Sequence, residues 1–364
     1  MTKHDIFYPG RINKMAAANR LVVAPMTRIS ASETGVAGER MRQYYARFAQ
    51  GGFGTIITEG IYIDDAWSQT YSFQSGLINS EQVEGWRAIT ENLHQLGSRV
   101  IAQIQHAGAL SQGNIYRTDT VGPSAIRPKG EQLKFYYGEG QYPTPRELTD
   151  AEIAQIIQSF ADTAVRAVKH AGFDGVEIHG ANGYLLDQFF TDYTNQRSDR
   201  WGGDIASRLS LTLEVIRAVR EAVGPDVVVG VRISQGKVND FHHKWAEGEA
   251  GAAAVFTQLA DAGIDYLHLT EFKAWEPAFA DSSLSLVELA RKFAPQLCIM
   301  ANGSVDSADK AQKVMTLGAD FIAIGKSALA NPDWPTRISQ HKALRAFDGN
   351  LLAPQADVKD SELK

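Results

Sequence analysis

Three hydrogen-bonding side chains, His179, Asn182 and Tyr184, lie within six residues of one another. They follow Val176 and Ile178, which belong to an apolar run typical of a buried strand. Polar groups at such a strand end either bind a ligand or find partners within the protein. For one residue the second explanation is the commoner, because His is usually structural and Asn-Gly is a common turn. A functional role therefore requires that the fold gather further polar groups around these three.

The phrase that contains these residues recurs along the chain. Residues 171–180, 262–271 and 317–326 each place Gly and then Asp directly before an aliphatic run. A helical pattern comes before each phrase, which predicts a helix ended by Gly, a short turn and a buried strand. Repeated units of this kind imply parallel strands connected by helices.

Eight strand candidates are present, and a plausible amphipathic helix follows each one. They are residues 21–26, 54–60, 100–105, 175–180, 227–234, 266–271, 298–304 and 321–326. Eight strand-then-helix units favour an α/β fold of the (β/α)8 TIM-barrel type. An open doubly wound sheet is the alternative, but the turn after the first strand lacks the G-x-G-x-x-G pattern typical of that fold.

Two stretches lie outside this repeat. Residues 107–149, after the third strand, are rich in Gly and Pro and lack a helical period, so we expect an inserted lid or capping loop. Residues from about 350 to 364 form a polar tail that we expect to fray. Neither stretch resembles a low-complexity linker, so the sequence predicts a single domain over residues 1–364.

The composition limits the possible classes of function. The 364 residues carry a net charge of -6, which argues against nucleic acid or an anionic membrane as a partner. The single cysteine, Cys298, excludes an internal disulfide, a zinc site built on several cysteines and an Fe–S cluster. The start of the sequence lacks the apolar core of a signal peptide, and no apolar run reaches membrane-spanning length, so we expect cytoplasmic residence.

In a barrel of this type, functional residues lie at the C-terminal ends of the strands. The strand that ends at 179–182 would therefore deliver its polar groups to the barrel mouth, where other strands end on Gln103, Arg232 and Asn302. Gly303, and Gly325 with Lys326, follow the last two strands, where barrels commonly bind phosphate. Together with Arg232 they favour a phosphorylated cofactor that lies across the barrel top.

These residues stand in motifs that resemble those of the Old Yellow Enzyme family of FMN-dependent oxidoreductases. The matching segments are "NRLVVAPMTR" (19–28), "TEG" (58–60), "AQIQHAG" (102–108), "AGFDGVEIHGANGYLLDQFF" (171–190), "NQRSDRWGG" (195–203), "GVRIS" (230–234) and "NPDWP" (331–335). The similarity covers nearly the whole chain, and the block around His179 is the most specific part. It implies tightly bound FMN that NADPH or NADH reduces, in a monomer or homodimer. It also implies hydride transfer from flavin N5 to an activated alkene, an α,β-unsaturated carbonyl or nitro compound.

The resemblance assigns a role to each member of the polar trio. His179 and Asn182 would donate hydrogen bonds to the substrate's carbonyl or nitro oxygen, on which charge develops as hydride arrives. Tyr184 would donate a proton to the α-carbon. Tyr71 and Trp275 are candidate walls of the substrate pocket.

The resemblance also implies a set of flavin contacts: Pro25, Met26, Thr27, Gly60, Gln103, Arg232, Asn302, Gly303, Gly325 and Lys326. Thr27, rather than Cys, aligns the chain with the classical branch of the family. Lys326 stands where Arg is usual, which replaces a bidentate fork with a point charge. Trp201 replaces a frequent Tyr and Gln105 a frequent Trp, so the substrate preference does not follow from the family pattern.

Two other classes of function compete with this one. A metal-dependent aldolase or isomerase would use Glu177, His179 and His268, of which the first two share one face of a strand. No acidic pair or His-rich spacing completes a ligand set, so we expect no bound metal. A non-catalytic flavin-binding protein would keep the phosphate site without needing the three polar residues together.

Overall fold

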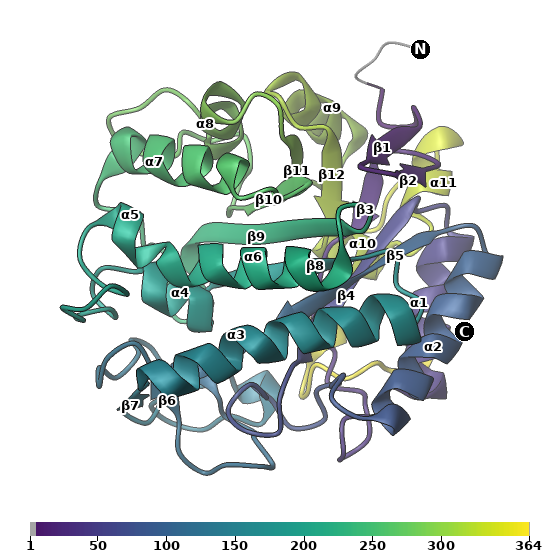
Figure 1. The fold of residues 1–364 in the computed structure, drawn as a ribbon. Helices are drawn as coiled ribbons and strands as arrows, with labels where there is room; N and C mark the ends of the chain where they lie inside the picture. The colour runs from purple at the N-terminus through teal and green to yellow at the C-terminus, as the bar shows by residue number, and fades with distance from the viewer. Residues whose placement is uncertain (1–4, 364) are drawn as a thin grey trace.

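The computed structural model describes residues 5–363, in which eight parallel strands close into a barrel (Figure 1). The strands are β3 (Leu21–Val23), β4 (Thr55–Tyr62), β5 (Arg99–Gln105), β8 (Gly175–Asn182), β9 (Val228–Lys237), β10 (Tyr266–Thr270), β11 (Cys298–Asn302) and β12 (Phe321–Ile324). They follow one another around the barrel in chain order, and β12 pairs with β3 to close it. The predicted TIM barrel is therefore confirmed, strand by strand.

Helices cover the outside of the barrel (Figure 1). They are α1 (Glu39–Gln50), α2 (Ser80–Gln95), α3 (Asp150–Val165), α4 (Leu185–Phe190), α5 (Ile205–Arg208), α6 (Ser210–Val223), α7 (Gly248–Asp261), α8 (Leu286–Phe293), α9 (Ala308–Thr316), α10 (Lys326–Ala330) and α11 (Trp334–Ser339). Helix α3 begins at a capping box, in which Thr149 and Glu152 each accept a hydrogen bond from the other's backbone amide. Such a cap satisfies amides that the first turn of a helix leaves unpaired. Within residues 5–363, no helix is both long and apolar enough to cross a bilayer.

Strand β8 shows how the barrel orients its side chains. Val176 and Ile178 belong to the core that the strands share with the outer helices. Glu177 alternates with them and reaches β10 across the barrel interior, where Tyr266 and His268 donate hydrogen bonds to it. The strand thus places a buried polar side chain inside the barrel, one pleat below His179.

The N-terminal end of the barrel is closed by a hairpin that the sequence analysis did not identify. Strands β1 (Gly10–Ile12) and β2 (Met15–Ala17) pair in antiparallel fashion. Ile12 and Met15 share an apolar cluster with Met300 in the middle of β11 and Phe321 at the start of β12. This apolar plug leaves the opposite end as the open end, where the predicted functional residues lie.

The insertion between β5 and α3 is largely irregular, as expected, but it carries two short strands, β6 (Val121–Gly122) and β7 (Arg146–Glu147), which pair in parallel. The expectation that the C-terminal tail frays is wrong. Ala356 and Val358 are buried, and the buried carboxylate of Glu362 binds the guanidinium of Arg28. The polar composition was misleading because a charged residue can be buried when a distant partner compensates its charge.

Candidate active site

The ends of β8, β9, β10 and β11 bring several predicted residues together at the open end of the barrel. His179 lies opposite Arg232 in the pairing of β8 with β9, and Thr270 lies opposite Asn302 in the pairing of β10 with β11. Arg232 Nη2 and Thr270 Oγ1 donate to Asn302 Oδ1 at 3.2 and 2.8 Å. Asn302 Nδ2 donates to the carbonyl of Ala323 at 2.8 Å, which fixes the amide orientation. A cation and an oriented amide therefore lie beside His179.

A buried polar layer supports this group from below, centred on Glu177. Its carboxylate accepts from Gln103 Nε2 at 2.8 Å, Tyr266 Oη at 2.9 Å and His268 Nδ1 at 2.8 Å. Burial raises the pKa of Glu177, but His268, the charge of Arg232 and the Tyr266 hydroxyl outweigh it and hold the pKa below its ordinary value. Glu177 is therefore ionised and satisfied by neighbours.

The same layer bears on the metal-dependent alternative. Glu177 and His268 bind each other, and a ligand set would need both to turn toward a common ion. Among residues 5–363 no group of three or more His, Cys, Asp or Glu side chains is arranged to hold a metal ion. The geometry therefore gives no support to a metal-dependent aldolase or isomerase.

The His179 imidazole is buried and neutral at pH 7. Burial lowers its pKa well below the ordinary value, and the charges of Arg232 and His268 lower it further. Its Nδ1 accepts a hydrogen bond from the backbone amide of Ala181 at 3.3 Å. A neutral imidazole that accepts at Nδ1 carries its proton at Nε2. His179 therefore has an N–H to offer to a ligand.

Asn182 ends strand β8 in a left-handed conformation, with φ of 63°. Its backbone amide donates to Ser234 Oγ at 2.8 Å, and its carbonyl accepts from the amide of Val238 at 3.0 Å. These bonds to β9 and the residue after it hold the strained backbone in place. The side chain is half-buried and makes no hydrogen bond within residues 5–363, so the carboxamide is available to a ligand.

Tyr184 belongs to a chain of aromatic side chains beside the barrel mouth. Its ring lies 5.0 Å from that of His179, and its hydroxyl hydrogen-bonds that of Tyr71 at 2.7 Å. Tyr71 stacks on Tyr136, ring centroids 4.2 Å apart, and the Tyr136 hydroxyl donates to the carbonyl of Thr27 at 3.0 Å. Burial raises the pKa of Tyr184 to about 12, although Tyr71 and Arg232 act against the shift. Tyr184 is thus a protonated phenol that lies next to His179.

The residues predicted to hold the flavin approach one another where β3, β11 and β12 end. A carbon added to Gly325 would lie 3.8 Å from Met26 Sδ and 4.0 Å from Asn302 Nδ2, so these two groups lie beside the bare backbone of Gly325. Gly303 has φ of 152°, and a side chain there would lie 2.5 Å from the carbonyl oxygen of Glu271. Arg232 Nε is buried without a partner in the described chain. A spare cationic donor and backbone kept bare by glycine fit the reduced ring and the phosphate of FMN.

The remaining flavin candidates line the same end of the barrel. Pro25 and Thr27 lie half-buried after β3, and Lys326 begins α10 after β12. Gly60 lies in a bulge of β4, and a side-chain carbon there would come within 1.8 Å of Gln105 Oε1. Gln105 itself is buried and donates to Thr70 Oγ1 at 2.7 Å. A side chain at position 60 would therefore require the Gln105 side chain to move from this place.

Two tryptophans considered in the sequence analysis, Trp275 and Trp201, make their contacts outside the tyrosine chain. Trp275 lies near the ammonium groups of Lys310 and Lys313 in α9, at 5.4 and 5.8 Å. Trp201 is buried, and its indole N–H donates to Asp150 at the start of α3 at 2.8 Å. These contacts secure loops to helices, and none of them joins the tyrosine chain.

Some residues of the site were missed from the sequence. Tyr136 lies in the tyrosine chain, and Tyr142 packs against Leu110 and Tyr184. Both come from "KFYYGEGQY" in the insertion. The available signal was a group of four aromatic residues, Phe135, Tyr136, Tyr137 and Tyr142, in a Gly-containing loop.

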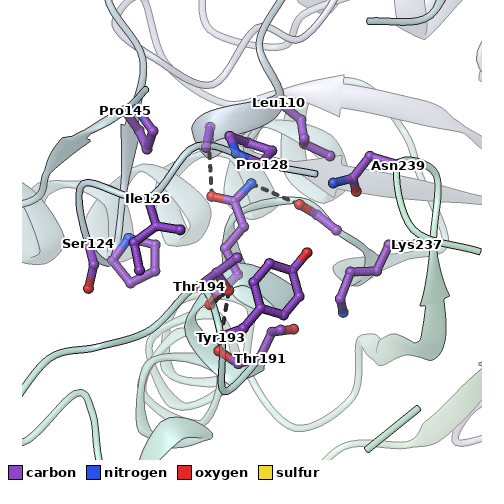
Figure 2. Close-up of a pocket in the computed structure, with 14 residues that line it drawn as sticks. Leu110, Ser124, Ile126, Pro128, Pro145, Thr191, Tyr193, Thr194, Lys237 and Asn239 are labelled. Atoms are coloured by element: carbon purple, nitrogen blue, oxygen red, sulfur yellow. Dashed lines mark hydrogen bonds between the residues drawn. The ribbon is translucent and has the colours of Figure 1, made fainter. Parts of the chain in front are cut away.

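A small cavity of about 10 Å³, room for roughly one water molecule, lies between the insertion and the chain that follows α4 (Figure 2). It is lined by Leu110, Ser124, Ile126, Pro128, Pro145, Thr191, Tyr193, Thr194, Lys237 and Asn239, among others. Among the lining residues, Lys237 pairs with Asp187 at 2.8 Å. Gly183, which directly follows the last residue of β8, also lines the cavity. The cavity therefore belongs to the seam beneath the insertion and lies outside the barrel mouth.

Residues 5–345 match the family model described as the NADH:flavin oxidoreductase / NADH oxidase family. The chain is 34% identical over 367 residues to chanoclavine-I aldehyde reductase of Penicillium roqueforti, covering 99% of this chain and 95% of the relative. It is 33% identical over 327 residues to a probable flavin mononucleotide-dependent alkene reductase of Leishmania infantum, covering 88% and 86%. An NADH oxidase of Thermoanaerobacter brockii is 32% identical over 92% of this chain, which spans about half (51%) of that relative's length.

The comparison with solved structures points to the same family as the sequence relatives. The fold superposes on the Old Yellow Enzyme homologue of Zymomonas mobilis with a TM-score of 0.88 and 30% identity, covering 99% of this chain and 98% of the other. The likeness therefore extends from the barrel to the insertion and the C-terminal segment. Sequence and structure together show that this chain belongs to the NADH:flavin oxidoreductase / NADH oxidase family and is an oxidoreductase of the Old Yellow Enzyme type.

Proposed function

We propose that this protein uses bound FMN and NADH or NADPH to reduce the activated C=C bond of α,β-unsaturated carbonyl or nitro compounds. One observation carries the proposal: a neutral His179, with its free N–H at Nε2, lies beside the protonated phenol of Tyr184. A hydrogen-bond donor and a proton donor in contact suit the addition of hydride and proton across a polarised double bond.

The cofactor would be held by residues from several strand ends. Gly303, Gly325 and Lys326 would receive the phosphate, because glycine allows backbone amides to approach an anion and lysine adds a charge. Arg232 would place its unpartnered Nε–H near the edge of the ring system that becomes negative on reduction. Gln103, anchored by Glu177, would lie along the pyrimidine edge. Pro25, Met26, Thr27, Gly60 and Asn302 would complete the contacts.

When bound, FMN would supply the redox chemistry, as a hydride acceptor toward the nicotinamide and a hydride donor toward the β-carbon of the alkene. His179 and Asn182 would bind the substrate's carbonyl or nitro oxygen, on which negative charge grows as the β-carbon is attacked. Both donors are held in position, one by the Ala181 amide and the other by the bonds to Ser234 and Val238. Donors that need no reorganisation stabilise the transition state more than the ground state.

Tyr184 would then give its proton to the α-carbon. With a pKa of about 12 it holds this proton at neutral pH and releases it only to a strongly basic carbon. The phenolate left behind would accept a hydrogen bond from Tyr71, whose hydroxyl lies 2.7 Å away. Besides forming a wall of the pocket, Tyr71 would therefore stabilise Tyr184 after it has given up its proton.

The absorption spectrum of the purified protein and a titration with phenol test this proposal. We expect a yellow protein with a flavin spectrum, and a long-wavelength charge-transfer band when phenol is added. His179→Ala should weaken phenol binding and lower kcat/KM for an enone about 10²- to 10³-fold, the usual loss when one such donor is removed. His170→Ala, an exposed histidine at the end of the segment after α3, is the matched control. A colourless protein that does not bind added FMN, or unchanged phenol affinity in His179→Ala, would refute the proposal.

A further inference from the structure

The C-terminal segment joins two parts of the chain that are far apart in sequence. Ala356 is fully buried; its amide donates to the carbonyl of Phe135 at 2.8 Å, and its carbonyl accepts from Arg28 Nε at 3.0 Å. Next to it, the Val358 amide donates to Ser30 Oγ at 2.8 Å. One irregular stretch of the tail therefore binds both the insertion and the chain that follows β3.

Glu362 fixes this stretch in place. Its carboxylate receives Arg28 Nη1 at 2.7 Å and Nη2 at 2.5 Å, a bidentate pair whose side chains are 3% and 1% exposed. Arg47 of α1 adds a second contact at 3.2 Å and also donates to the Glu362 carbonyl. A buried guanidinium without its carboxylate would be left uncompensated, so this pair holds the tail in one position.

Both anchored segments lead directly to the proposed site. Arg28 follows Thr27, whose carbonyl receives the Tyr136 hydroxyl. Tyr136 follows Phe135, which Ala356 holds, and stacks on Tyr71, which in turn bonds Tyr184. The tail is thus linked to the proposed proton donor by three contacts, namely the hydrogen bond to Phe135, the ring contact of Tyr136 with Tyr71 and the hydrogen bond of Tyr71 to Tyr184. The peptide bond from Phe135 to Tyr136 completes the path.

We propose that Glu362 is a positioning residue: through Arg28 and Ala356 it holds Tyr136 against Thr27 and so sets the place of the Tyr71–Tyr184 pair. The kinetic part of this inference rests on the function proposed above, whereas the positional part concerns the chain alone. A tether that only stabilised the fold would need no contact with the tyrosine chain. Here the tail's amide and carbonyl reach Phe135 and Arg28, the direct neighbours of the Tyr136–Thr27 hydrogen bond.

The test uses Glu362→Gln, which keeps the volume and one acceptor while it removes the charge. Asp360→Asn is the matched control, because it neutralises a carboxylate in the same turn whose pair with Arg40 is exposed. Hydrogen–deuterium exchange, with and without FMN, should show faster exchange in residues 133–138 and 26–31 for Glu362→Gln and no change in these segments for Asp360→Asn. Unchanged exchange in both segments would overturn the proposal whether or not the protein reduces alkenes.

Kinetics per bound flavin supply the second readout. We expect Glu362→Gln to lower kcat for an enone about tenfold with little change in KM, since a small displacement of a proton donor affects the transition state. Tyr136→Phe removes the hydroxyl that bonds Thr27 and should lower kcat in the same way. If the tail acts through Tyr136, the double variant will be no slower than the slower single variant. Wild-type turnover in Glu362→Gln, or simple multiplication of the two effects, would overturn this role while leaving alkene reduction itself intact.

Discussion

Two buried glutamates on neighbouring parts of the barrel behave in opposite ways. Glu177 in β8 accepts hydrogen bonds from Gln103, Tyr266 and His268, and its pKa lies below the ordinary value. Glu59 in β4 is equally buried, but among residues 5–363 Tyr45 is the one side chain that donates to its carboxylate, at 3.1 Å, and Oε1 lacks a close partner. Burial raises the pKa of Glu59 to about 7, although Tyr45 and Arg28 act against the shift.

The difference shows that donors, more than depth, decide whether a buried carboxyl is charged. Desolvation disfavours the ionised form at both positions. At Glu177 three donors and the charge of Arg232 reverse its effect, which provides a permanent anion beneath the cation that would face the flavin. At Glu59 the compensation is partial, so the carboxyl titrates near neutrality. The two residues should therefore respond differently to the same substitutions and to pH.

The largest expected effect is that of Glu177→Gln. The new amide would direct an N–H toward one of the three donors that now bind the carboxylate, and the charge that compensates Arg232 would be gone. The free energy of unfolding should therefore fall by about 3–5 kcal/mol, as for a broken buried pair. Urea unfolding at pH 8 measures this loss. Glu59→Gln is the internal control and should leave stability at this pH unchanged or increased, because it removes a poorly compensated charge. Equal effects of the two substitutions would mean that the donor sets do not distinguish the two sites.

The pH dependence of stability should come next in size. The folded-state pKa of Glu59 is raised from 4.5 to about 7, so the folded protein binds this proton more tightly than the unfolded chain does. This contribution to stability is complete below pH 4.5, is lost as pH rises toward 7 and stays lost above it. The shift corresponds to about 3 kcal/mol. Unfolding free energies at pH 5 and pH 8 should show the wild type losing that amount relative to Glu59→Gln; parallel profiles for the two proteins would contradict the expectation.

The contrast between these glutamates also marks what the sequence can and cannot predict. The barrel was predictable because eight strand candidates are each followed by a helical pattern, and the convergence of His179, Arg232 and Asn302 followed from strand order alone. The state of Glu59 and Glu177 was not predictable, because it depends on which side chains reach them from other strands and helices. Tyr45, for example, lies in α1 and meets Glu59 only after α1 has packed on the barrel.

The C-terminal tail illustrates the same limit. Its sequence is rich in polar residues, and nothing within residues 350–364 indicates that Glu362 is buried. Its partner Arg28 lies 334 residues away, at the end of the motif 19–28, and the resemblance assigned no role to this arginine. Local patterns therefore predicted elements and strand ends, whereas long-range charge pairs required the folded structure.

The smallest expected effect is that of Tyr45→Phe, which removes the only side-chain donor to Glu59. The Tyr45 hydroxyl also accepts the backbone amide of Glu59 at 3.0 Å, so the substitution costs two hydrogen bonds within one buried pair of groups. We expect a loss of about 1–3 kcal/mol at pH 8, where Glu59 is ionised, and a smaller loss at pH 5, where the carboxyl is neutral. The pKa of Glu59 should rise further, which moves the stability profile toward higher pH. Thermal or urea unfolding of Tyr45→Phe across this range, with Tyr45→Phe/Glu59→Gln as control, measures both effects. Because the double variant has no carboxyl to titrate, its profile should be flat over this interval, and a remaining slope would assign the pH dependence to another group.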